Sequence, residues 1–202
     1  RWTPEMMIQY KRLGKTAISE DGKFIAYEVS VPLVEGEKSE FHTQIWLLST
    51  YDDNTFQLTQ GATSSSMPQF SSDSKWLAFL SSRGKDKTRQ LFIIPIGGGE
   101  AIQLTDENSS ISRFEWSPDG SLIAFTMTDP ETEEDKKRKK EKRDWEIIDQ
   151  DYKYSHLYAI NTIGKKKIRQ LTKGEMNVGS FDWSPDGNKI VFDHTEIPGA
   201  NS

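Results

Sequence analysis

The chain has 202 residues, of which 34% are hydrophobic and 28% are charged, with a mean hydropathy of -0.70 and a net charge of -5 at pH 7. No run of about 18 apolar residues occurs, so the sequence predicts no membrane span, and the acidic balance argues against nucleic-acid binding through bulk charge. Zero cysteines exclude disulfides, thiolate zinc sites and cysteine nucleophiles, and leave the compartment open between cytoplasm and periplasm or exterior.

Residues 1–14 predict a short N-terminal helix and a lead-in to the rest of the chain. Thr3 is a candidate N-cap, Pro4 suits the first helical position, and Gly14 lies beyond the end of the helix. The apolar residues that follow occur in short β-branched or aromatic runs, which is typical of strands.

Residues 15–202 contain an internal repeat whose first element is a turn. The turn is complete in Ser117–Gly120 and Ser184–Gly187, which both read Ser-Pro-Asp-Gly, and degenerate near Asp21 and Asp73. Pro presets the backbone of a type I turn, Asp bonds its own backbone, and Gly accepts a positive φ. The predicted structural turn residues are Asp21, Gly22, Asp73, Pro118, Asp119, Gly120, Pro185, Asp186 and Gly187.

Two further elements recur at fixed distances from this turn. Gln-Leu-Thr occurs at 57–59, 103–105 and 170–172, and each Thr precedes the turn Asp of the next repeat by the same number of residues. An aromatic-centred run stands before each of them, around Trp46, Phe92 and Tyr158. Four short antiparallel strands that repeat in this way predict the blades of a propeller.

We therefore expect an all-β fold, a partial β-propeller of four-stranded antiparallel blades, about three and a half in number, behind the N-terminal helix. The spacing places blade 1 at about 15–59, blade 2 at about 67–105 and blade 3 at about 112–172, with half of blade 4 at about 180–194. Blade 3 carries a charged insertion over 129–154.

The insertion supplies the candidate substrate-approach residues, which are Glu133, Glu134, Trp145, Tyr152 and Tyr154. The glutamate pair can hold a peptide α-ammonium, but it can equally belong to the surrounding charge run. The aromatic residues either line a substrate approach or anchor the insertion on blade 3, and we favour the anchor. The basic stretch 136–140 follows an acidic block, so a solvated arm is favoured over a polyanion site.

No catalytic residue, metal site or cofactor is predicted. The sequence lacks a Gly-x-Ser-x-Gly elbow, so no serine is marked as a nucleophile. His42, His156 and His194 lack the spacing of metal ligands, and we expect them to be ordinary strand-edge residues.

The repeat, Leu-Thr followed by Trp-Ser-Pro-Asp-Gly and Ile-Ala-Phe, resembles the TolB-like (PD-type) propeller repeat. The opening Thr3-Pro-Glu-Met with Lys11-Arg12, and the segment Tyr154-Ser-His-Leu-Tyr158, are similar to the acylaminoacyl-peptidase and dipeptidyl-peptidase branch of the prolyl oligopeptidase family. The likeness covers nearly the whole chain. Blade 1 departs from the repeat by lacking the turn Pro, and blade 2 by lacking both Pro and Gly.

The resemblance implies a propeller that precedes a C-terminal α/β-hydrolase domain with a Ser-Asp-His triad, whose motifs lie beyond residue 202. This chain is then the non-catalytic N-terminal part, which gates the access of short peptides to the hydrolase. The implied partners are that hydrolase domain and peptide substrates, and open propeller edges predict self-association. The alternative is a TolB-like scaffold that binds a protein or glycan and has no hydrolase domain.

Overall fold

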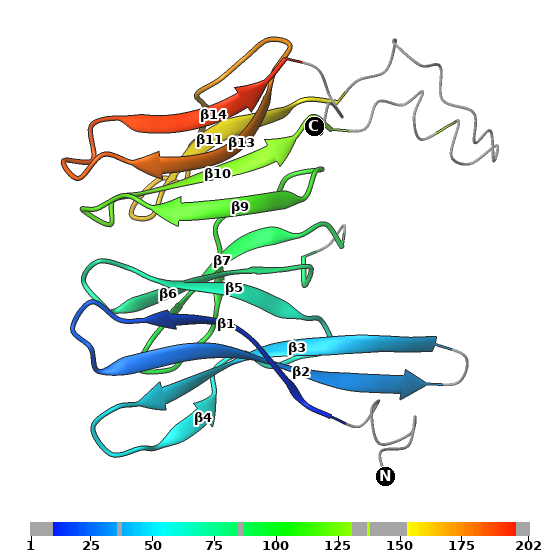
Figure 1. Ribbon diagram of the computed structural model, residues 1–202, viewed down its shortest axis with the longest axis vertical. Helices are drawn as coiled ribbons and strands as arrows, with labels where there is room; N and C mark the ends of the chain where they lie inside the picture. The colour runs from blue at the N-terminus through cyan, green and yellow to red at the C-terminus, as the bar shows by residue number, and fades with distance from the viewer. Residues whose placement is uncertain (1–9, 36–37, 85–86, 131–136, 138–152, 197–202) are drawn as a thin grey trace. The chain divides into compact units, whose positions relative to one another are not determined.

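A computed structural model describes residues 10–35, 38–84, 87–130, 137 and 153–196. They form fourteen β-strands in three four-stranded sheets and one two-stranded sheet (Figure 1), which confirms the all-β class with four-stranded antiparallel blades. The predicted helix falls mainly on residues 1–9, which lie outside the described residues. No helix in the described ranges is long and apolar enough to cross a membrane.

Each sheet is a meander in which consecutive strands pair antiparallel. Sheet 1 contains β1 (Arg12–Ile18), β2 (Phe24–Glu35), β3 (Lys38–Ser49) and β4 (Thr55–Gln57). Sheet 2 contains β5 (Ser65–Phe70), β6 (Trp76–Ser81), β7 (Gln90–Pro95) and β8 (Ile102–Gln103). Sheet 3 contains β9 (Ile111–Trp116), β10 (Leu122–Thr128), β11 (Ser155–Asn161) and β12 (Ile168–Gln170). Sheet 4 contains β13 (Asn177–Trp183) and β14 (Ile190–Thr195).

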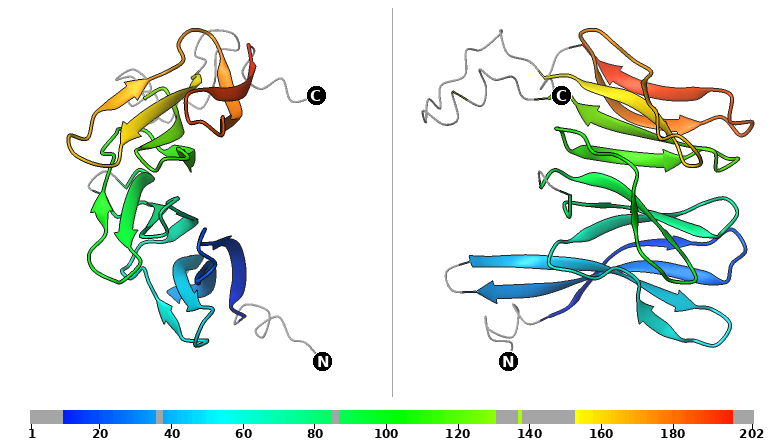
Figure 2. Two further views of the ribbon diagram at one scale, coloured as in Figure 1. Left: turned by 90° about the vertical axis from the view of Figure 1, so that its left-hand side faces the viewer. Right: turned by 180° about the vertical axis from the view of Figure 1, so that it is seen from behind.

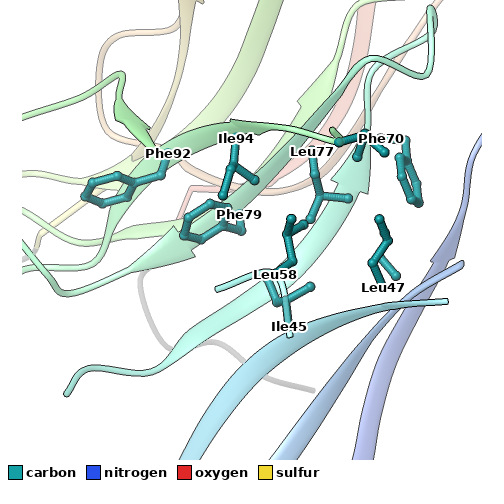
Figure 3. Packing of buried hydrophobic residues seen from close by; sticks show 10 residues of the cluster. Ile45, Leu47, Leu58, Phe70, Leu77, Phe79, Phe92 and Ile94 are labelled. Carbon is teal, nitrogen blue, oxygen red and sulfur yellow. The ribbon is translucent and has the colours of Figure 1, made fainter. Parts of the chain in front are cut away.

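The chain divides into two compact units, Arg1–Thr105 with sheets 1 and 2, and Asp106–Ser202 with sheets 3 and 4. In unit 1 the two sheets share one apolar core (Figure 3). Sheet 1 contributes Ile45 and Leu47 from β3, and sheet 2 contributes Leu77 and Phe79 from β6. Five of the six residues of β6 are buried, although successive side chains point to opposite faces. Both faces of this strand are therefore covered.

A carboxylate also joins the two sheets of unit 1. Glu28 of β2 accepts the Lys15 N–H at 3.0 Å beside the bulge in β1, and it accepts the Met67 N–H of β5 at 2.7 Å. A Cβ at Gly14 would meet the Glu28 side chain, so the close approach of this carboxylate favours glycine there. Beyond this joint, the twelve-residue strands β2 and β3 form a hairpin that extends past the rest of their sheet (Figure 2).

Unit 2 has a smaller core of the same kind. Ala124 and Leu157 of sheet 3 pack with Val178 and Phe181 of sheet 4. The Trp183 indole N–H donates to the Glu115 carbonyl at 3.3 Å, so the aromatic residue before the turn links the neighbouring sheets. Burial of faces between adjacent sheets is thus common to both units.

The shared core of unit 1 predicts a large penalty for truncating Phe79. Phe79 is 0% exposed and stacks on Phe92 with ring centroids 5.7 Å apart. Phe79→Ala should lower the free energy of unfolding by about 3–5 kcal/mol, since it removes a buried ring and leaves a cavity. Tyr51→Ala is the matched control, because Tyr51 is 94% exposed, and it should cost less than about 0.5 kcal/mol. Urea denaturation measures both, and equal costs would contradict the shared core.

Candidate functional site

The turn between the first two strands of each sheet is built by one serine and one aspartate. The serine Oγ donates to the aspartate at 2.7 Å in Ser19–Asp21, 2.6 Å in Ser71–Asp73, 2.6 Å in Ser117–Asp119 and 2.5 Å in Ser184–Asp186. The same Oγ accepts the backbone N–H five residues on, and the aspartate accepts the N–H two residues on. The turn is therefore closed by side chains as well as by its backbone.

The fourth position of the turn has a positive φ in every sheet. Gly22, Gly120 and Gly187 have φ of 69°, 71° and 69°, and Ser74 has φ of 56° in the same place. The degenerate turn of sheet 2 thus keeps the geometry without Pro or Gly, because Ser71 and Asp73 make the same bonds. Pro118 and Pro185 lie at the second position of the other two turns.

These bonds lower the pKa of all four turn aspartates, Asp21, Asp73, Asp119 and Asp186, below the ordinary value of 3.8. The hydrogen bond from the serine is the main cause in each. A charged acceptor is a stronger partner than a neutral one, so the ionised carboxylate is favoured in the folded state. The ionised aspartates therefore stabilise the turns, and nothing in the four turns resembles an activated nucleophile.

The Leu-Thr element ends in a buried threonine that bonds to the third strand. Thr105 Oγ1 donates to Gln90 Oε1 at 2.7 Å and accepts the Leu91 N–H at 3.0 Å. Thr59 makes the same pair of bonds, to Gln44 Oε1 at 2.6 Å and from the Ile45 N–H at 2.9 Å. These glutamines were not predicted from the sequence. The glutamines can be recognised in the sequence by their position, because each stands two residues before the aromatic residue of the third strand.

Sheet 3 replaces this glutamine by His156. Thr172 Oγ1 accepts the Leu157 N–H at 3.0 Å and lies 3.4 Å from His156 Nδ1, while His156 Nε2 is 3.8 Å from Asp129 Oδ1. His156 is 4% exposed and lies in β11, an inner strand, so it is not the strand-edge residue that the sequence analysis expected. Both distances are long for a proton relay, and the Thr172 hydroxyl accepts the backbone N–H of Leu157.

Asp129 and Tyr154 close the base of the blade 3 insertion. The Asp129 N–H donates to the Tyr154 carbonyl at 2.9 Å, and the Tyr154 N–H donates to Asp129 Oδ2 at 3.3 Å. Burial raises the pKa of Tyr158, and the charges of Asp129 and Glu107 raise it further. Burial also raises the pKa of Glu107, with Asp106 adding to the effect. We call Asp129, Tyr154, His156 and Tyr158 the insertion base. Its carboxylate environment favours a cationic group over an anionic one.

The corresponding end of sheet 2 has the opposite charge. Arg83 follows the second strand of sheet 2 and lies two residues beyond Ser81, which pairs with Gln90. Asp129 has the same place in sheet 3, two residues beyond Met127, which pairs with His156. The Arg83 guanidinium lies over the stacked rings of Phe79 and Phe92, 5.1 and 5.4 Å from their centroids. It donates to Ser65 and Ser81, and burial lowers its pKa. Equivalent positions in different sheets thus carry different chemistry on one scaffold.

Of the predicted substrate-approach residues, Tyr154 lies at the insertion base. Glu133, Glu134, Trp145 and Tyr152 lie outside the described residues. Across the described ranges, no three His, Asp or Glu side chains are placed to hold a metal ion.

The buried threonine predicts a sharp difference between two substitutions. Thr105→Val keeps the shape but removes the acceptor for Leu91 N–H and the donor to Gln90, and it should cost about 1–3 kcal/mol of unfolding free energy. Thr105→Ser keeps the hydroxyl and should retain most of that energy. Chemical denaturation of both variants tests this, and a serine variant as unstable as the valine variant would show that the methyl group, not the bond, matters.

The lowered pKa of Asp119 predicts a pH-dependent effect. Asp119→Asn should destabilise the protein at pH 7. The difference should shrink as the pH falls below about 4, where the unfolded chain takes up the proton first, and should vanish only at the lower pH at which Asp119 of the folded protein is protonated. Glu107→Gln should instead stabilise the folded protein at pH 7, because burial disfavours the ionised Glu107 carboxylate. Urea midpoints from pH 7 down to about pH 3 measure both effects. A constant difference for Asp119→Asn at every pH would contradict the assignment.

Similarity to peptidases extends over most of the chain. No protein-family profile matches it. It is 32% identical over 186 residues to the uncharacterized peptidase YuxL of Bacillus subtilis, covering 85% of this chain and 28% of that protein. It is 26% identical over 218 residues to dipeptidyl-peptidase 5 of Porphyromonas gingivalis, covering 94% of this chain and 30% of that protein. The chain thus spans less than a third of the length of these curated relatives.

Solved structures agree on the fold. The uncomplexed acylaminoacyl peptidase of Pyrococcus horikoshii matches 95% of this chain with a TM-score of 0.66 at 16% identity, over 29% of its own length. A TolB protein of Agrobacterium tumefaciens matches 93% of this chain with a TM-score of 0.56 at 18% identity, over 60% of its length. At such identities the likeness shows the fold alone, a partial β-propeller. Together with the sequence relatives, which are named as peptidases, it supports a TolB-like propeller region of a prolyl oligopeptidase-family peptidase.

Proposed function

We propose that the chain is the non-catalytic propeller segment of a serine peptidase, and that it limits the access of short peptides to a C-terminal α/β-hydrolase domain outside residues 1–202. The observation that carries this is the match to YuxL, which takes in 85% of this chain but only 28% of that peptidase. Most of the relative lies outside the match, which leaves ample length for a separate catalytic domain.

The bonding of the repeat supports a structural role for its hydroxyl groups. The turn serines each donate to an aspartate and accept a backbone N–H, as Ser117 does with Asp119 and Leu122. The threonines of the Leu-Thr element are buried and bonded to the third strand. A catalytic serine needs an adjacent base and an exposed oxygen. The hydroxyl groups of these residues instead make hydrogen bonds that hold the turns and strands together.

The peptide approach that we propose runs along the blade 3 insertion. It takes in Glu133, Glu134, Trp145 and Tyr152 of the insertion, together with Tyr154 at the insertion base. The carboxylate of Asp129, whose side chain is partly exposed, adds negative charge there. A peptide α-ammonium is the cationic group that such an approach would favour, through charge-assisted hydrogen bonds.

The isolated chain should therefore be inactive. We expect no hydrolysis of peptide p-nitroanilides and no labelling by a fluorophosphonate probe, with a known serine peptidase as the positive control. Labelling of the folded chain that disappears on heat denaturation would contradict the proposal, because it would reveal an activated serine within these residues.

The reading frame that encodes this chain provides a second test of the proposal. A Gly-x-Ser-x-Gly motif in the same reading frame, followed by Asp and His, would support the peptidase. A reading frame that ends soon after the last blade would instead favour a TolB-like scaffold that binds a protein or glycan.

A further inference from the structure

Every Asp-Gly sequence of the chain lies in a turn between the first two strands of a sheet. These sequences are Asp21-Gly22, Asp119-Gly120 and Asp186-Gly187. Asp-Gly is chemically labile, because glycine has no Cβ to shield its backbone nitrogen from the preceding aspartate. The nitrogen attacks the aspartate Cγ, an N–Cγ bond forms, the Cγ–OH bond breaks, and the amide proton leaves with that hydroxyl as water. Water then opens the cyclic imide at its other carbonyl, which leaves isoaspartate in the backbone.

Each of the three turns holds the glycine nitrogen that would attack. The Gly22 N–H donates to the Ser19 carbonyl at 2.8 Å, and the Gly120 N–H donates to the Ser117 carbonyl at 2.9 Å. The same bond in the turn of sheet 4 measures 2.8 Å. A nitrogen bonded in this way must give up its hydrogen bond before it can lose its proton and attack, so the bond raises the barrier to ring closure.

The turn also holds the carboxyl group that would be attacked. In sheet 3, Ser117 Oγ donates to Asp119 Oδ1 at 2.6 Å, and the Ser121 N–H donates to the same oxygen at 3.1 Å. Ring closure expels a carboxyl oxygen as water, which the group can do only after it has taken up a proton. The hydrogen bonds favour the ionised carboxylate, and the one from Ser117 is the main cause of the lowered pKa of Asp119.

We propose that the serine at the start of each of these turns protects the Asp-Gly sequence that follows it from conversion to isoaspartate. Its carbonyl holds the attacking nitrogen and its hydroxyl keeps the attacked carboxylate ionised, so one residue restrains both reacting groups. The protection is local, because these bonds join residues no more than three positions apart. Three serine–aspartate pairs protect independently, namely Ser19 with Asp21, Ser117 with Asp119 and Ser184 with Asp186.

Conversion of one turn would disturb the strand pair beside it. Isoaspartate adds a carbon to the backbone and moves the carboxylate, so the bonds from Ser117 and Ser121 to Asp119 could not form as they do now. Trp116 of β9 pairs with Ile123 of β10 directly next to this turn. The register of an antiparallel pair depends on the geometry of its turn. The protected bond therefore maintains the pairing of the first two strands of the sheet.

A peptide of residues 115–123 provides the unprotected reference for the 202-residue chain. Both are incubated at pH 7 in the same buffer. An isoaspartyl methyltransferase with a labelled methyl donor counts isoaspartate, and peptide mapping after incubation in heavy-oxygen water assigns it to a turn. Asp119 should convert at least about ten-fold more slowly in the folded chain than in the peptide, because hydrogen bonds to a charged group are among the strong ones. Equal rates would overturn the proposal.

Two serine variants test whether the hydroxyl is the protecting group. Ser117→Ala keeps the carbonyl but removes the hydroxyl, and it should speed conversion at Asp119 by about ten-fold. Asp21 and Asp186 of the same molecule are the matched controls and should convert at the parent rate. Ser184→Ala is the reciprocal variant, which should speed conversion at Asp186 alone. Circular dichroism checks that both variants fold.

The three turns also separate local protection from global stability. Parent rates at both targeted aspartates would overturn the proposal, because the serine hydroxyls would then protect nothing. An equal rise at all three aspartates in both variants would overturn it as well, because the protection would then come from the stability of the whole chain.

Discussion

The structure depends on one constraint: a single sheet of four strands cannot cover both of its own faces. Only 34% of the residues are hydrophobic, so no large core is available. β6 is buried on both faces nonetheless, because the neighbouring sheet of its unit covers one of them. In unit 1 the residues that make this possible, such as Leu47 and Phe79, come from different sheets. Each sheet is stable through its neighbour, and that dependence is what makes the repeat an array.

Polar groups inside these thin sheets are placed so that they cost little. Thr105 and Gln90 are almost wholly buried, but each satisfies the other and the threonine also serves the third-strand backbone. No buried side-chain polar atom in the described residues is left without a hydrogen-bond partner. Because buried polar groups are expensive only when unpaired, this bond holds the third and fourth strands together without weakening the core.

The parts of the fold that the sequence predicted are those with local causes. The turns could be found because Ser117 and Asp119 act within a few residues of each other, and strands because apolar runs alternate with such turns. Gln90 could not be assigned, since its partner Thr105 lies 15 residues away and glutamine has no distinctive preference for that place. Glu28 joins sheets through Met67, 39 residues on, and no local pattern marks it. His156 was misjudged for the same reason: its burial is decided by neighbouring strands.

The repeats differ in the residues that follow their second strands. The shared turn and the buried threonine recur with little change, whereas the ends of the second and third strands carry Arg83 in sheet 2 and Asp129 in sheet 3. Loops at such ends vary most easily, since the strands behind them do not depend on their composition. We propose that the peptide approach includes the insertion base, where Asp129 supplies a partly exposed carboxylate.

The dependence of each sheet on its neighbour can be measured by amide hydrogen exchange in a Leu47→Ala variant. Leu47 lies in β3 of sheet 1, is 0% exposed, and belongs to the core shared with sheet 2. The account predicts faster exchange in β6 and β7 of sheet 2 as well as in β3, since the cavity removes contacts from both sheets. Faster exchange confined to sheet 1 would contradict it, because the sheets would then be stable independently.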